Sequence, residues 1–127
     1  MSDNRDLSEN REQTKSEILE RRMLTFAANI IRKLKKSTLP KSVIDQLTRS
    51  SASIGANYAE ACNAASKLDF RNKIFIAKKE AAETRYWIDL CIELNAQEDW
   101  SHHRQESHEL LVILQTIINS LNKRPEK

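Results

Sequence analysis

The residues that could do chemistry in this chain are its carboxylates and its three histidines. A helical bundle that binds two metal ions through carboxylates needs paired Glu-x-x-His motifs, and the sequence has none. Asp99 and His102 have that three-residue spacing, but they fall in a predicted loop and at a helix start. His102, His103 and His108 lie in a polar run, which favours solvated side chains over metal ligands. With no glycine-rich phosphate loop or nucleophile motif in the sequence, we predict no enzymatic activity, no metal site and no cofactor.

The segment SSASIGANYAEA, residues 50–61, is polar and small where a helix built only to bury core would carry leucine and isoleucine. On a helical wheel, one flank of its apolar face is thin and lets a neighbouring backbone approach closely. That flank consists of Thr48, Ala52, Gly55 and Ala59. The other flank is a polar stripe that consists of Ser50, Ser53, Asn57 and Glu60.

The polar stripe has a structural and a catalytic interpretation. In the structural one, the serine hydroxyls bond back to carbonyls one turn earlier, and Asn57 and Glu60 bond to an adjacent helix or subunit. A catalytic or metal-binding role would need partners, for which Glu80 and Glu83 are the candidates. We expect the structural role.

Basic residues are concentrated in the first two thirds of the chain. Residues 16–80 carry thirteen Lys and Arg against six Asp and Glu, whereas residues 81–127 carry five against eight. Such asymmetry permits an anionic partner, but solvated helix faces produce it as well. The candidate nucleic-acid-binding residues are Arg32, Lys33, Lys35, Lys36 and Lys41 near the first predicted turn, and Lys67, Arg71, Lys73, Lys78 and Lys79 early in the third helix.

Apolar periodicity predicts four helices, over residues 15–36, 41–64, 67–94 and 102–122. Helices of this length joined by short connections favour an all-α, up-down-up-down antiparallel four-helix bundle. One glycine and two prolines in 127 residues also leave little turn chemistry for a multistranded fold.

Cap signals set the predicted helix starts. Thr14 with Glu17 has the spacing of a capping box, and Ser66 with Asp69 repeats the pattern. Because Pro40 tolerates only a first-turn position, the second helix begins near it. Ser42 with Asp45 offers the cap of that helix.

Each predicted helix carries a core face. In chain order, the core residues are Ile18, Leu19, Met23, Phe26, Ile30 and Leu34; Val43, Leu47, Ile54, Tyr58 and Ala61; Phe70, Ile74, Ala77, Ala81, Thr84, Ile88 and Cys91; and Leu110, Leu114, Ile117 and Leu121.

The third helix has a second apolar side as well, formed by Ile76, Trp87, Leu90 and Leu94. Either this helix is the most enclosed of the bundle or the strip contacts another subunit, and we favour self-association. The residues predicted for helix packing or a subunit interface are Ser53, Asn57, Glu60, Ile76, Glu80, Glu83, Trp87 and Leu90.

The chain suits one domain, which we assign to residues 15–124, preceded by a polar, mobile leader at 1–14. Cys62 and Cys91 lack CxxC spacing, so we expect buried free thiols in a reducing compartment. No apolar run resembles a signal peptide or a membrane span. We expect a cytoplasmic protein with no membrane partner.

Two motifs carry a family resemblance, SIGANYAEA in the second helix and DFRNKIFIAKKEAAETRYWIDL in the third. Leu39 with Pro40 fits the pattern's first turn, and SHELLVILQTIINSL fits its last helix. Over about residues 20–122, the sequence resembles the four-helix-bundle proteins encoded by intervening sequences within bacterial 23S ribosomal RNA genes. The family often has glycine where this chain has Ala61, so the same close contact is not expected there.

The resemblance implies a bacterial, non-enzymatic protein that assembles into a ring-like homopentamer. It also implies a more distant likeness to the accessory protein of diversity-generating retroelements, whose basic pentamer binds a reverse transcriptase and nucleic acid. Two functions remain open. One is an accessory protein that binds RNA or DNA through a basic patch multiplied by the ring, although little aromatic interleaving for single-strand stacking is seen. The other is a protein-binding scaffold or adaptor without a nucleic-acid role.

Overall fold

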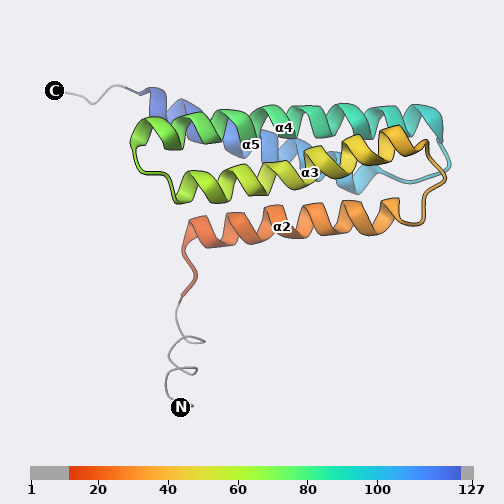
Figure 1. The fold of residues 1–127 in the computed structure, drawn as a ribbon, viewed down its shortest axis with the longest axis horizontal. Coiled ribbons are helices and arrows are strands. Elements are labelled where there is room, and N and C mark those ends of the chain that lie inside the picture. The colour runs from red at the N-terminus through yellow and green to blue at the C-terminus, as the bar shows by residue number, and fades with distance from the viewer. Residues whose placement is uncertain (1–11, 124–127) are drawn as a thin grey trace, which may run out of the picture.

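Four helices lie side by side, each antiparallel to the helix before it, in a computed structural model that describes residues 12–123 (Figure 1). They are α2 (Lys15–Leu34), α3 (Lys41–Cys62), α4 (Lys67–Leu94) and α5 (Ser101–Asn122). The predicted all-α four-helix bundle is therefore confirmed. Most of the leader predicted at 1–14 lies outside the described residues, as does residue 124 of the assigned domain.

Two of the three predicted caps are present. The Thr14 hydroxyl accepts a hydrogen bond from the Glu17 amide at 3.0 Å, and the Glu17 carboxylate accepts one from the Thr14 amide at 2.9 Å. Ser66 caps α4 by accepting from the Asp69 amide at 3.0 Å. The Ser42 prediction was wrong, because α3 starts directly after Pro40 and no side chain caps it.

The predicted core is confirmed in most positions and wrong at the open ends of α2 and α5. The core faces of α3 and α4 are buried, except that Phe70 is only partly covered. Ile18 and Leu121, predicted as core, are 52% and 39% exposed. In the last turns of α5, Ile118 takes the buried position that was predicted for Ile117.

Arg22 bridges the seam between α2 and α5. Its guanidinium donates to the Glu106 carboxylate at 2.7 and 2.8 Å and to Glu109 at 2.8 Å. These bonds, with Glu106 contributing most, raise the pKa of Arg22. The pKa of Glu109 is lowered, first by a hydrogen bond from Gln105 and then by Arg22. The ion pairs thus hold α2 against α5, and α2 otherwise packs mainly on α3.

Both cysteines are free, as predicted, but only one is buried. Burial raises the pKa of the Cys91 thiol to about 11, so that thiol stays protonated. Cys62 is exposed in the last turn of α3, where its Sγ lies 3.0 Å from the Ser16 hydroxyl. Across residues 12–123, no helix has both the length and the apolar character that a membrane span requires.

Candidate nucleic-acid interface

The ten predicted basic residues form two clusters, one at the turn between α2 and α3 and one that extends from the start of α4 to the middle of that helix, at Lys78 and Lys79. The turn between α2 and α3 lies at one end, and α4 begins at the other (Figure 1). At about 1.5 Å per residue, the 22 residues of α3 separate these ends by roughly 33 Å. We call the two groups the turn cluster and the α4 cluster. They do not form one continuous patch on a single chain.

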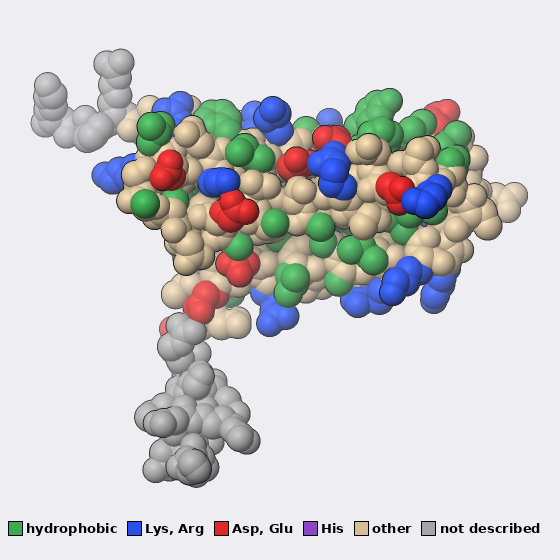
Figure 2. Space-filling model, in the orientation of Figure 1, with side chains coloured by type: hydrophobic (Ala, Val, Ile, Leu, Met, Phe, Trp, Pro, Cys, Tyr) green, Lys and Arg blue, Asp and Glu red, His purple; other side chains and the backbone are tan. Residues whose placement is uncertain are grey.

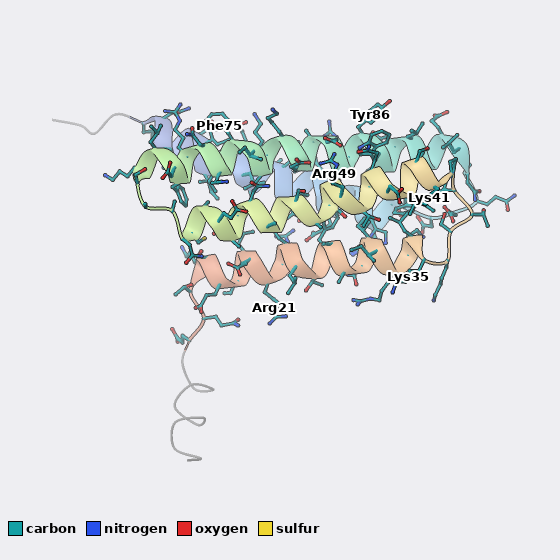
Figure 3. All side chains as sticks on the ribbon, viewed as in Figure 1. Arg21, Lys35, Lys41, Arg49, Phe75 and Tyr86 are labelled. Atoms are coloured by element: carbon teal, nitrogen blue, oxygen red, sulfur yellow. The ribbon has the colours of Figure 1, made fainter. Side chains whose placement is uncertain are left out.

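In the turn cluster, Lys35 and Lys36 point into solvent and form no ion pair with any described residue. Figure 3 shows Lys35 at the same end of the molecule as Lys41. Lys41 is exposed too, but its ammonium pairs with Asp45 at 2.7 Å. Lys33 lies over the Trp100 ring, 4.9 Å from its centroid, and Arg32 donates to the side chain of Asn29 at 3.0 Å. Two lysines of this cluster therefore keep their charge free for a phosphate.

The α4 cluster has as many residues outside ion pairs as the turn cluster. Lys73 forms an ion pair with Glu60 at 2.6 Å. The remaining members form no ion pair within residues 12–123: Lys67, Arg71, Lys78 and Lys79. Each cluster therefore keeps four basic residues outside any ion pair with the described residues.

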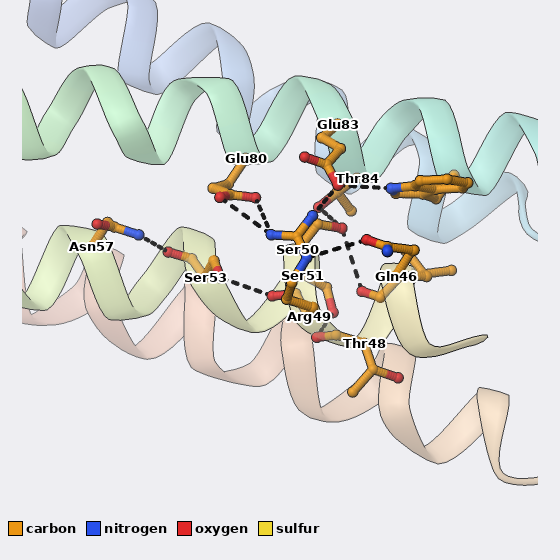
Figure 4. A network of polar contacts seen from close by, with 12 residues as sticks. Gln46, Thr48, Arg49, Ser50, Ser51, Ser53, Asn57, Glu80, Glu83 and Thr84 are labelled. Atoms are coloured by element: carbon orange, nitrogen blue, oxygen red, sulfur yellow. Dashed lines mark hydrogen bonds and ion pairs between the residues drawn. The ribbon is translucent and has the colours of Figure 1, made fainter. Parts of the chain in front are cut away.

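The polar stripe of α3 forms a structural network with α4, as Figure 4 shows. Ser53 donates to the Arg49 carbonyl at 2.8 Å, which confirms the predicted bond to a carbonyl one turn earlier. Asn57 donates to the Ser53 carbonyl at 2.8 Å, so its amide is used in its own helix and not by a neighbour. Glu60 does reach α4, through Lys73.

Arg49 is the member of this network that the sequence analysis missed. Its guanidinium bonds to both Glu80 and Glu83, and the Trp87 indole N–H donates to Glu83 at 2.9 Å (Figure 4). The two glutamates are therefore occupied by a cation of the same chain. Arg49 lies one turn before Ser53 on the same side of α3. A helical wheel of the sequence therefore places it in line with the polar stripe.

The second apolar side of α4 is partly covered within the chain. Trp87 and Leu90 are half-buried against the core, whereas Ile76 and Leu94 are 39% and 51% exposed. Packing against the core of the same chain thus explains the apolar character of part of this strip. Its use as a subunit contact stays a prediction.

The thin flank of α3 does allow the close approach that was predicted. A Cβ atom added to Gly55 would lie 3.2 Å from the Cβ of Met23 on α2. Above this contact runs an apolar groove between α2 and α3, with a cavity volume of about 430 Å³. We call it the α2–α3 groove; its lining includes Leu24, Ile31, Ala52, Gly55, Ala56 and Ala59. Figure 2 shows hydrophobic side chains between the two helices along this band.

The histidines do not form a metal site. His102 and His108 are exposed, as predicted, whereas His103 is half-buried against the edge of Trp100, with ring centroids 5.5 Å apart. Burial, followed by the nearby charge of Lys33, lowers the pKa of His103. Within the part of the chain that the structure describes, no group of three or more His, Cys, Asp or Glu residues is arranged to hold a metal ion.

The sequence matches the family model of the 23S rRNA-intervening sequence proteins over residues 15–123, which is the entire bundle. The chain belongs to this family. A search among curated proteins finds no significant match. The predicted family membership is thereby confirmed, and the motifs in α3 and α4 that suggested it fall inside the matched range.

Among solved structures, the family member is similar to a crystal structure of a protein with unknown function from the S23 ribosomal protein family of Bacteroides thetaiotaomicron. The two share 35% sequence identity and superpose with a TM-score of 0.75. The similarity covers 84% of this chain and 99% of the other. Shared fold and family follow from this match.

Proposed function

We propose that this protein is a non-enzymatic, oligomeric accessory protein of the cytoplasm that binds the backbone of RNA or DNA through its basic surface. One observation carries the proposal. Among residues 12–123, four basic side chains in each cluster form no ion pair with a carboxylate: Arg32, Lys33, Lys35 and Lys36 at the turn, and Lys67, Arg71, Lys78 and Lys79 on α4. Unpaired cations of this kind displace the counterions of phosphate groups, which gives binding that tolerates sequence and falls with salt.

The proposal includes self-association, because one cluster holds few charges. A ring repeats each cluster, and linked weak contacts gain affinity by avidity. The α2–α3 groove is the surface that we assign to a second copy of the chain. Its lining is apolar except for Glu20, so it suits the apolar face of a helix from the next subunit, and such a contact joins two different surfaces head to tail. Repeated head-to-tail contacts of this type close into a ring when the rotation permits.

The test is size-exclusion chromatography with light scattering, run with and without a mixed RNA ladder at low and high salt. Two charge-reversal variants probe the clusters, Lys35→Glu with Lys36→Glu, and Lys78→Glu with Lys79→Glu. A matched control reverses the exposed Lys15 and Lys123, which lie outside both clusters and change the net charge equally. Each lysine pair that contacts phosphate should weaken binding about tenfold or more at low salt and reduce the salt dependence.

Two outcomes would contradict separate parts of the proposal. Wild-type protein that binds no RNA or DNA at low salt would overturn the nucleic-acid proposal. Binding that is equal in both cluster variants and the control would remove these lysines from the interface.

A protein-binding scaffold is the second candidate, and the α2–α3 groove favours it. Apolar grooves between two helices receive the apolar face of a third helix in many complexes. A pentamer-sized particle that ignores nucleic acid at every salt concentration would favour this function.

A further inference from the structure

The outward face of α4 carries two aromatic rings among its basic residues. Phe75, Lys79, Ala82 and Tyr86 follow one another at spacings of four, three and four, which places them in one line along the helix. Figure 3 shows Phe75 and Tyr86 both pointing outward from α4. Figure 2 shows hydrophobic and basic side chains alternating along this edge. We call this line, with Arg71 before it, the α4 stripe.

The chemistry of the α4 stripe differs from that of an ordinary solvated face. Tyr86 is 60% exposed, although a ring of this size usually loses more of its surface on folding. Its ring contacts the edge of Trp87, with centroids 5.2 Å apart, which fixes its orientation. The guanidinium of Arg71 lies over the Phe75 ring, 5.5 Å from its centroid. Both rings are thus held in place. Phe75 is half-buried with part of its ring packed against the core, whereas Tyr86 is largely exposed.

Up to Tyr86, acidic residues are kept away from the α4 stripe, whereas beyond it the exposed Glu93 lies in the same direction around the helix as Phe75. Glu80 and Glu83 lie on the side that faces α3, where Arg49 binds both. Asp69 is displaced from the direction of Phe75 by about 120° around the helix. Before Tyr86, the charges on the outward face are therefore all positive, and they come from Arg71, Lys78 and Lys79.

We propose that the α4 stripe binds single-stranded nucleic acid by stacking bases on Phe75 and Tyr86 while Arg71, Lys78 and Lys79 contact the phosphates. Phe75 and Tyr86 are separated by about 16 Å along the helix, a distance that several nucleotides span. Ala82 lies between the two rings and has a small side chain, so a nucleic-acid strand can approach the helix there. Aromatic stacking tolerates any base, which fits a binder without a reading motif. This inference rests on the proposed nucleic-acid function and names its ligand class.

The experiment measures binding of the full chain to a labelled uridine-rich single strand, by fluorescence anisotropy, with a duplex RNA of equal length and a single-stranded DNA as further probes. Tyr86→Leu and Phe75→Leu keep an apolar side chain but remove the ring. Each should weaken single-strand binding about fivefold or more, with an unchanged salt slope, because no phosphate contact is lost. Tyr86→Phe, which keeps the aromatic ring, should bind single strands with the affinity of the wild type.

Val112→Ala is the matched control, because Val112 is 49% exposed on α5 and outside the α4 stripe. Single strands should be preferred over the duplex by the wild type and not by Tyr86→Leu. If the ring variants bind single strands as well as wild type does, stacking is overturned while backbone binding stands. If the wild type binds none of the three probes at low salt, the proposed function itself fails.

Discussion

At the scale of single residues, the contact between α3 and α4 depends on a buried hydrogen bond from Thr84 to Ser50. The two oxygens lie 2.9 Å apart, and both residues are fully buried. Thr84→Val keeps the shape but removes the donor, and the Ser50 hydroxyl then retains a long bond of 3.5 Å to the Leu47 carbonyl. We expect a loss of about 1–2 kcal/mol in the free energy of unfolding, measured by urea denaturation.

The control is Thr116→Val on α5, where the exposed hydroxyl bonds to a carbonyl of its own helix. It should change the free energy of unfolding little. Combining Thr84→Val with Ser50→Ala should cost less than the sum of the single changes, because each removes the same bond. Additive single changes would mean that the two hydroxyls are not coupled.

At the scale of helices, the caps offer a paired comparison. Ser66→Ala removes the hydroxyl that accepts from the Asp69 amide at the start of α4, so it should cost about 1 kcal/mol in thermal or urea unfolding. Ser42→Ala should be close to neutral, because Ser42 lies inside the first turn of α3 and caps nothing. Equal losses in the two variants would contradict this assignment of the helix starts.

Local signals predicted the helices well because they depend on neighbours in sequence. Thr14 and Ser66 cap as their spacing indicates, and the periodicity of α3 and α4 identified the buried faces. Ile18 and Leu121 were wrong for a non-local reason. A wheel gives the direction of a side chain but not whether a neighbouring helix covers it, and the helix ends here leave both residues exposed.

The candidate site was only partly predicted, again because its contacts depend on how neighbouring helices are placed. Ser53, Glu60, Glu80 and Glu83 were recognised as polar groups beside the core, but Arg49, which binds both Glu80 and Glu83, was not. Pairing across α3 and α4 depends on the axial register of the two helices, and composition and periodicity do not fix that register.

At the scale of the whole molecule, the antiparallel topology determines where the basic clusters can act. Because α3 runs the length of the bundle between them, one chain presents the turn cluster and the α4 cluster to different surroundings. In the proposed ring, the turn cluster and the α4 cluster would each be repeated once per subunit. The subunit contact decides whether that ring forms, so the α2–α3 groove is the position at which to test it.

Filling that groove should break the oligomer without unfolding the chain. Ala56 is exposed and lines the groove, so Ala56→Lys places a charged side chain where we expect a helix of the next subunit. By light scattering, the wild type should have a mass of roughly five times 14.7 kDa, and the variant a mass near that of one chain, with unchanged helicity and melting temperature. Ala82→Lys, a similar change at an exposed alanine of α4, should leave the mass unchanged. If Ala56→Lys keeps the wild-type mass, the subunit contact lies elsewhere, and the half-buried strip at Trp87 and Leu90 becomes its best candidate.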